Sequence, residues 1–579
     1  MLKRLLGFNL KNFILNGLAR LSLTLQQWLR DWLPSGSPPT DSPTLTTRPS
    51  PWAGKSWRSL ILGLSTGVLI LGLGGHSLDR AWASPLAPRS GQTDLQPYLD
   101  RVAQNITEFT LDNGLKFIVM ERHQAPVVSF MTYADVGAVD EPDGKTGVAH
   151  FLEHLAFKGT SRIGTEDYDQ ERLILDRLDR VFEQRQIARQ GSDAGEIDRL
   201  NAEFETLQTQ AAALVRQNEL GQIIEQMGGV GLNASTSTDA TLYFYSLPAN
   251  KLELWMSLES ERFLDPVFRE FYAEQQVILE ERRMRLDNNP VNQLFDAVQG
   301  TAFQVHPYGR PVIGEAEDIA NLSRRDVQEF FSSHYTPDKL TLAVVGDVDP
   351  QAVRHLAQRY FGRFQATASS PGSLVSAIAP EPPQQEPRSV TLQRPTQPWY
   401  VVAYHSPAVG DPDYVTCQVL VQILSSGRTS RLYRTLVDEQ QIALAAQGTS
   451  GYPNDKYPNL LLFYALTAPG HSLDEVATAL DRELEQIQRE PVTTSELDRV
   501  KNQVRAGLLQ SLGSNRGMAA TLTEYEVKTG SWRNLFKELD QVAQLTPADL
   551  QRVAQTVLRP ENRTVGRLVT GEAPTDPGN

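Results

Sequence analysis

Cysteine is almost absent from this chain, since Cys417 is the only one among 579 residues. A single cysteine cannot form an intramolecular disulfide, and it excludes a zinc site built from several thiolates. The low cysteine content is compatible with a reducing compartment and does not exclude export.

Basic residues are also in deficit, with 55 Lys and Arg against 69 Asp and Glu, which gives a net charge of −14. This acidity argues against a nucleic-acid-binding protein and is neutral on enzyme activity.

Histidine is scarce as well, with nine residues, yet two of them share the short apolar run Gly147–Lys158. The spacing of His150, Glu153 and His154 brings all three to one side of a predicted helix. Two neutral imidazoles on one helical face form half of a zinc site, and a neighbouring carboxylate can accept a proton from a water that the metal activates. The order is the inverse of the His-Glu-x-x-His found in ordinary zinc proteases.

The alternative for these three residues is an ordinary buried helix, because a lone histidine on such a helix is more often a satisfied core residue than a ligand. Here three ionisable groups occupy five positions that look buried. Burying them without partners would cost about several kcal/mol. The pattern therefore favours a metal site.

The first 83 residues do not resemble a globular domain. Residues 1–33 form a basic, Leu-rich amphipathic pattern that could lie on a membrane surface, and residues 35–51 form a Pro/Ser/Thr linker. A positive flank, the apolar run Leu60–Gly74 and the small residues around Trp82 then predict an export signal. An uncleaved anchor and a misassigned start codon are the alternatives. In each case we expect the remainder to be delivered across or to a membrane.

After a linker at 84–104, the sequence becomes globular. Residues 106–122 predict a β-hairpin with its turn at Asn113-Gly114, and residues 127–142 predict a strand that leads into the histidine-bearing helix. The charged stretch 170–217 predicts solvated helices packing on a sheet. Residues 228–250 predict a Gly-rich loop, a strand, a turn and a second strand.

Two carboxylates downstream are candidates to complete the metal site. Glu274 and Glu281 lie seven residues apart on a predicted helix, so they share a face. Inverted zinc peptidases take a third protein ligand from a downstream helix, and the pattern Glu-x-x-Val-Ile-x-x-Glu favours Glu281 as that ligand, with Glu274 supporting it. Glu280 is the competing choice, but it points about 100° away. Without the upstream histidines these residues would be interpreted as a surface charge run.

From about residue 105 to the end, the chain resembles the pitrilysin/insulysin family of inverted zinc metallopeptidases, in particular the mitochondrial-processing-peptidase-like branch. The matching motifs occur in the family's order: His150–His154, Gly231–Thr236, Glu274–Glu281, His306–Gly309 and Val345–Val348. The resemblance implies a zinc endopeptidase with one Zn²⁺ per chain, Glu153 as general base, and ligands His150, His154 and Glu281. It also implies that an extended substrate adds to the edge strand formed by Asn233, Ala234, Ser235 and Thr236.

The family's fold is of the α+β class. The resemblance implies two homologous halves, each a mostly antiparallel sheet flanked by helices, which dimerise into a closed clamshell chamber. We expect a catalytic half at 105–370, a Pro-rich linker at 371–389 and a degenerate, non-catalytic half at 390–579.

An internal repeat supports the duplication independently. The segments 322–328 and 545–551 each begin fifteen residues before a proline, Pro337 or Pro560. Each proline is followed by a β-type run with a threonine at the matching offset. A helix, a turn and a strand are therefore predicted to occur twice.

The second copy lacks the metal-binding residues. Aligning Gly427 with Gly159 places Gln418 and Gln422 where the first copy has His150 and His154, and a valine replaces the general base. The C-terminal half is therefore expected to keep the fold without binding zinc in this way, and to form a wall of the chamber that holds substrate.

The chain also departs from the family's pattern. Active members present an Arg and a Tyr, seven residues apart, that help to hold substrate, and alignment places Val437 and Leu444 at these positions. Arg434 lies nearby, but Gln441 stands seven residues after it. The resemblance then implies a heterodimer with a zinc-less homologous subunit that supplies the pair.

Two other functions remain open at this point. One is a structural or assembly subunit on the same fold, which would place no demand on Glu153. The other is a module that binds peptides without cutting them, which the missing Arg/Tyr pair keeps possible. Neither the substrate nor its cleavage preference is encoded in a recognisable motif.

Overall fold

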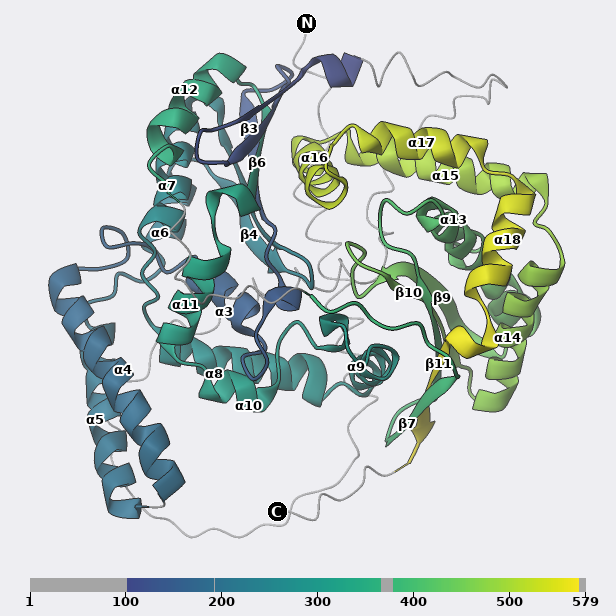
Figure 1. Cartoon of the computed structure of the whole chain (residues 1–579), viewed down its shortest axis with the longest axis horizontal. Coiled ribbons are helices and arrows are strands. Elements are labelled where there is room, and N and C mark those ends of the chain that lie inside the picture. The colour runs from purple at the N-terminus through teal and green to yellow at the C-terminus, as the bar shows by residue number, and fades with distance from the viewer. Residues whose placement is uncertain (1–100, 192, 366–377, 572–579) are drawn as a thin grey trace, which may run out of the picture. The chain divides into compact units, whose positions relative to one another are not determined.

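The computed structural model describes residues 101–191, 193–365 and 378–571, all within one compact unit. They form two sheets with their flanking helices, as expected for an α+β protein of two similar halves (Figure 1). The predicted amphipathic N-terminus, the linkers before residue 101 and the export signal lie outside the described residues. No helix in the described part of the chain has the length and apolarity needed to cross a bilayer.

The first sheet has six strands in the order β1-β2-β6-β3-β5-β4, and only β2 and β6 run parallel. The predicted hairpin is confirmed, since β1 and β2 pair around Gly114, whose φ of 96° suits the turn. The predicted pair β4 and β5 is confirmed as well. The strands are β1 Ile106–Thr110, β2 Lys116–Glu121, β3 Val127–Ala134, β4 Val230–Thr236, β5 Thr241–Pro248 and β6 Leu340–Gly346.

The described part of the first half contains ten helices of more than five residues. They are α3 Val148–Leu155, α4 Tyr168–Gly191, α5 Ala194–Ala212, α6 Glu219–Gln226, α7 Leu252–Leu264, α8 Phe271–Arg282, α9 Pro290–Ala302, α10 Ala316–Asn321, α11 Arg324–His334 and α12 Pro350–Phe361.

The charged stretch 170–217 forms helices α4 and α5 as predicted, but the prediction that they pack on a sheet was wrong. They form a pair that extends away from the strands (Figure 1), and their aromatic side chains Phe182 and Phe204 contact Tyr272 of α8. The sequence pattern predicted the solvated faces of these helices correctly. It did not show that the narrow apolar faces of the two helices pack against each other and against α8.

The second sheet repeats the topology of the first with one strand fewer. Its order is β7-β11-β8-β10-β9, and β11 runs parallel to β7 and antiparallel to β8, just as β6 does with β2 and β3. The strands are β7 Arg388–Arg394, β8 Trp399–Ser406, β9 Ala443–Tyr452, β10 Asn459–Thr467 and β11 Arg563–Thr570. The helices are α13 Tyr414–Ser425, α14 Leu473–Arg489, α15 Thr494–Ser511, α16 Asn515–Thr529, α17 Asn534–Gln544 and α18 Pro547–Val557.

The predicted helix–turn–strand repeat is confirmed. Helices α11 and α18 both begin with a capping box, formed by Ser323 with Asp326 and by Thr546 with Asp549. In each half a 3-10 turn starting at the proline leads into the strand, β6 or β11. Strand β7 begins at Arg388, before the predicted end of the Pro-rich linker.

The two halves exchange helices across their sheets. Helix α16 of the second half packs on β3 and β6, where Met518 and Leu522 join a core with residues of the first sheet. Helix α9 of the first half packs on the second sheet, where Leu294 and Val298 contact its strands (Figure 1). Each half therefore covers an apolar sheet face of the other, so the packing of the first half depends on the second.

A buried ion pair joins the segments that carry the predicted metal ligands. Arg269, just before α8, donates to Glu171 of α4 at 2.8 Å, and both side chains are at most 1% exposed. The same guanidinium donates to the carbonyl oxygens of Lys158, Thr160 and Ile163, in the segment after α3. Arg269 thereby fixes the start of α8 relative to the end of α3.

We predict that Arg269→Met lowers the free energy of unfolding by about 3–5 kcal/mol, because it leaves the Glu171 carboxylate buried without its partner. Chemical denaturation checks this. The matched control is Arg359→Met, which breaks an ion pair with Glu253 whose side chains are 64% and 57% exposed and should cost less than about 1 kcal/mol. Equal losses in the two variants would contradict this role of Arg269.

Candidate metal centre

Helix α3 carries the histidines into the core. It begins after Gly147, whose φ of 87° is left-handed, and a Cβ there would meet the carbonyl oxygen of Ile313 at 2.7 Å. The carboxylate of Glu141 accepts the N–H groups of Gly147 and Ala149, each at 2.9 Å, so the buried helix start has partners. The apolar residues of the helix face the core, which leaves His150, Glu153 and His154 on the side toward α8 and β4.

Helix α8 brings the third predicted ligand to the histidines. It packs on α3, where Phe151 stacks on Phe271 with ring centroids 4.4 Å apart. Nε2 of His154 lies 3.5 Å from Oε2 of Glu281, and Nε2 of His150 lies 3.9 Å from Oε1 of the same carboxylate. The competing Glu280 is exposed and pairs with Arg283, away from this cluster. The structure therefore brings together the three residues that the sequence singled out.

These three side chains have the arrangement of a cation site. One ligand atom from each of His150, His154 and Glu281 lies within 4.8 Å of the others, and no other such group of three occurs in the described residues. Two imidazole nitrogens and one carboxylate oxygen form a donor set that suits zinc and leaves a fourth position open. Nδ1 of His150 is buried without a hydrogen-bond partner, so the fit of this residue rests on its Nε2 atom.

The charges around the three side chains favour a cation. Burial lowers the pKa of His150 to about 3, which keeps its imidazole neutral at pH 7. Burial opposes ionisation of Glu281, but the hydrogen bond from His154 and the charge of Arg285 hold its pKa at about 2. Burial also opposes protonation of His154, yet the neighbouring carboxylates Glu274 and Glu281 raise its pKa to about 9. The carboxylates around His154 therefore favour a positive charge at this ring, and a bound metal ion would supply that charge in place of the ring proton.

Glu274 orients one of the ligands. Its Oε1 lies 2.9 Å from Nδ1 of His154, which turns Nε2 of that ring toward Glu281. Lys158 contacts the other oxygen of Glu274 at 2.8 Å. Burial opposes ionisation of Glu274, but His154 and Lys158 hold its pKa at about 2. Glu274 thus contacts His154, and its role in supporting a metal ligand stays a prediction.

Glu153 lies between the histidines and strand β4. Its Oε2 accepts the hydroxyl of Thr236 at 2.6 Å. Burial raises the pKa of Glu153, which makes its carboxylate a stronger base than an exposed one. Among the four predicted substrate-binding residues, Thr236 is thus the one whose side chain contacts the candidate base, whereas Ala234 is buried and Asn233 is exposed.

Strand β4 is the last strand of its sheet. Among the described residues its one strand neighbour is β5, so its other edge has backbone N–H and C=O groups available to a further strand. The contacts of Asn233, Ala234 and Ser235 with any substrate remain a prediction.

The sequence analysis did not identify two positively charged side chains of the site, those of Arg285 and Lys158. Arg285 pairs with Glu281 at 2.7 Å, and Lys158 pairs with Glu274. Both could have been found, because Arg285 follows Glu281 by four residues and Lys158 follows His154 by four, the spacing of neighbours on a helix. Glu141 gave no such signal, since a loop joins it to the helix that it caps.

The second half has no counterpart of this cluster in its described residues. Gln418 and Gln422 lie on α13, which follows β8 as α3 follows β3. Gln418 donates to the hydroxyl of Tyr414 at 2.7 Å. Val437 lies in a π-helical segment at Tyr433–Glu439, and Leu444 is 51% exposed on β9. Their alignment with an Arg/Tyr pair remains a prediction.

Comparison with known proteins gives one consistent result. The sequence profile described as "Insulinase (Peptidase family M16)" matches residues 116–173 and 204–316, and that described as "Peptidase M16 inactive domain" matches residues 321–504. The chain is similar to a zinc protease, PqqE, of Helicobacter pylori, with 28% identity over 79% of this chain and 90% of that protein. It is also similar to a probable mitochondrial-processing peptidase subunit beta of Schizosaccharomyces pombe, with 26% identity over 78% of this chain and 88% of that protein.

A solved structure agrees with these similarities. The crystal structure of a protease from Helicobacter pylori superposes with a TM-score of 0.67 at 26% identity, covering 80% of this chain and 99% of that one.

If the cluster binds zinc, adding Zn²⁺ to the metal-free chain will raise its melting temperature. At about a thousand times the Kd, binding adds about 4 kcal/mol of stability. We expect His154→Ala to lose this shift and His471→Ala to keep it, because His471 is 36% exposed and contacts Glu475 outside the cluster. Differential scanning calorimetry measures both. An undiminished shift in His154→Ala would exclude this residue as a ligand.

Proposed function

Because the chain belongs to the insulinase family of peptidases, peptidase family M16, we propose that it is a zinc-dependent endopeptidase. The observation that carries the proposal is the convergence of His150, His154 and Glu281 beside the buried carboxylate of Glu153. The substrates are peptides or unstructured polypeptides. Folded proteins are excluded, because substrate must take an extended form to pair with β4.

In this proposal His150, His154 and Glu281 hold one Zn²⁺. The metal, when bound, supplies a Lewis acid that polarises a peptide carbonyl and lowers the pKa of a water molecule. Glu153 accepts the proton of the attacking water and then delivers it to the leaving amine. The Thr236 hydroxyl holds the Glu153 carboxylate in place during both transfers, and Glu274 holds the His154 ring.

Substrate binding follows from the free edge of β4. An extended peptide adds there by main-chain hydrogen bonds, with Asn233, Ala234, Ser235 and Thr236 alongside it. Such pairing recognises the backbone of the peptide more than its side chains. We therefore expect broad sequence preference, restricted by the walls of a closed chamber.

We further propose that this chamber forms by dimerisation, with a zinc-less homologous subunit as partner. The basis is the alignment of Val437 and Leu444 with the family's Arg/Tyr pair, which a second copy of this chain would not supply. The N-terminal segment, with its basic amphipathic part and export signal, supports delivery to the far side of a membrane and association with its surface.

We predict that Glu153→Gln keeps zinc but lowers kcat for an unstructured peptide by about 10²–10⁴-fold, because the amide cannot accept the proton. Zinc content by atomic absorption and hydrolysis of a quenched fluorescent peptide check this. Glu280→Gln is the matched control, since this carboxylate precedes Glu281 on α8 but is exposed and pairs with Arg283 outside the cluster. Full activity in Glu153→Gln would exclude Glu153 as the general base.

The partner prediction is tested by sizing chromatography of the chain purified from its own cells without chelator. We expect peptide hydrolysis and zinc in fractions that also contain a zinc-less homologue. Activity in fractions with this chain alone would contradict the heterodimer and show that the Arg/Tyr alignment is wrong. Zinc with no hydrolysis in either set of fractions would favour a peptide-binding subunit instead.

A further inference from the structure

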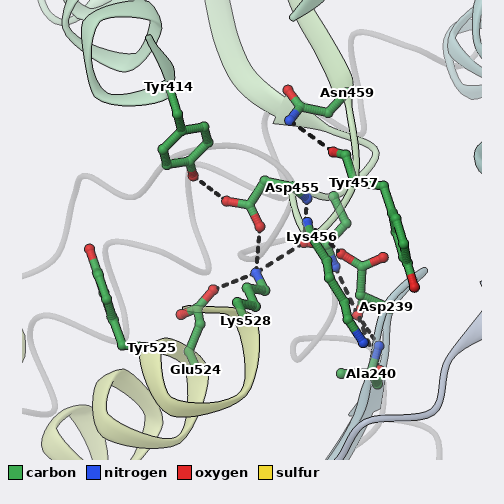
Figure 2. Close-up of polar contacts among 12 residues, drawn as sticks. Asp239, Ala240, Tyr414, Asp455, Lys456, Tyr457, Asn459, Glu524, Tyr525 and Lys528 are labelled. Atoms are coloured by element: carbon green, nitrogen blue, oxygen red, sulfur yellow. Dashed lines mark hydrogen bonds and ion pairs between the residues drawn. The ribbon is translucent and has the colours of Figure 1, made fainter. Parts of the chain in front are cut away.

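A loop of the degenerate half contacts a turn beside the candidate base. The loop Asn454–Tyr457, between β9 and β10, meets the turn Ser237–Ala240, between β4 and β5 (Figure 2). Nδ2 of Asn454 donates to Oγ of Ser237 at 3.0 Å, and the backbone N–H of Lys456 donates to Oδ2 of Asp239 at 3.0 Å. The Lys456 ammonium also pairs with Asp135 at the end of β3.

The contacted turn leads directly to the hydrogen bond on Glu153. Ser237 follows Thr236, whose hydroxyl donates to Glu153 at 2.6 Å. The turn is close-packed, because a Cβ at Gly137 would meet the carbonyl oxygen of Thr238 at 2.4 Å. Asp239 is 1% exposed and accepts the Tyr308 hydroxyl at 2.7 Å. A shift of this turn would therefore be passed to Thr236 and to the carboxylate that it holds.

The loop in turn depends on a charged group of its own half. The Asp455 carboxylate accepts the Lys528 ammonium at 2.6 Å and the Tyr414 hydroxyl (Figure 2). Lys528, which is 8% exposed, also donates to Oδ1 of Asn454 at 3.2 Å. Asp455 thereby fixes the residue that contacts Ser237.

Helix α13 takes part in this support. Gln418, which aligns with His150 of the first half, donates to the Tyr414 hydroxyl at 2.7 Å, and that hydroxyl donates to Asp455. The helix that lost its metal ligands thus supplies a hydrogen-bonded chain that ends at the loop. The chain runs from Gln418 through Tyr414 and Asp455 to Asn454.

We propose that Asp455 is a positioning residue for peptide hydrolysis: through the loop Asn454–Tyr457 it holds the β4–β5 turn, and with it Thr236 and the Glu153 carboxylate. This inference rests on the proposed function. The physical basis is that a general base held in its reactive orientation avoids the loss of rate caused by small misplacements, which reaches about 10²-fold for a shift of about 1 Å. The second half then contributes to catalysis by positioning the general base, in addition to enclosing the substrate.

The variant that tests the proposal is Asp455→Asn in the full chain, with any co-purifying partner. It keeps the side-chain shape and removes the charge that binds Lys528. The matched control is Asp481→Asn, because Asp481 also accepts a tyrosine hydroxyl, that of Tyr400, and pairs with a cation, Arg563 at 2.6 Å, in the same half. Asp481 has no contact with the loop or the turn among its hydrogen bonds and ion pairs in the described structure.

We expect Asp455→Asn to lower kcat at least about tenfold while KM and zinc content stay within about twofold, and Asp481→Asn to leave kcat within about twofold. The melting temperatures of both variants are measured in parallel. A kcat loss that is equal in both variants, or that follows the loss of thermal stability, would overturn the proposal.

A second measurement does not depend on turnover. Hydrogen–deuterium exchange of the peptides covering residues 232–242 should increase at least about tenfold in rate in Asp455→Asn and stay unchanged in Asp481→Asn. Unchanged exchange in Asp455→Asn overturns the positioning role, whatever the activity. If the exchange result is as expected but the wild type cuts no peptide, the proposed function fails and the hold of the loop on the turn stands.

Discussion

Three ionisable side chains on two turns of a buried helix are the constraint on which the structure depends. Burial removes His150, Glu153 and His154 from water. Each of the three side chains therefore has a polar or charged group close by. Glu281 faces both rings, Glu274 holds His154, and Thr236 donates to Glu153. These partners come from α8 and β4, so the relative placement of α3, α8 and β4 decides whether the helix can be buried at all.

The rest of the fold fixes that placement from two directions. Arg269 ties the start of α8 to the segment after α3 and to α4. From the other side, α16 of the second half packs on the first sheet and the loop Asn454–Tyr457 contacts the turn after β4. The second half repeats the sheet topology of the first, and its loop donates hydrogen bonds to the turn that follows Thr236.

Much of this could be predicted from the sequence, because the signals are local. The spacing of His150 and His154 and the seven-residue interval between Glu274 and Glu281 are helical distances, and the structure brings these side chains together. The hairpin around Asn113-Gly114 and the repeat ending at Pro337 and Pro560 are local as well.

What the sequence could not show are choices among distant partners. The amphipathic patterns of α9 and α16 reveal an apolar face but not that each face packs on the sheet of the other half. The same holds for α4 and α5, whose aromatic residues Phe182 and Phe204 pack on Tyr272 of α8. The pair Lys456 with Asp135 joins residues 321 positions apart, and no periodicity links them.

Diffraction at the zinc absorption edge can test whether α3, α8 and the edge of β4 form one zinc peptidase site, as we propose. The crystal would contain Glu153→Gln with an uncleaved unstructured peptide. We expect one anomalous peak among His150, His154 and Glu281, with the peptide lying as an additional strand along β4. A peak at other residues, or a peptide bound away from β4, would contradict it.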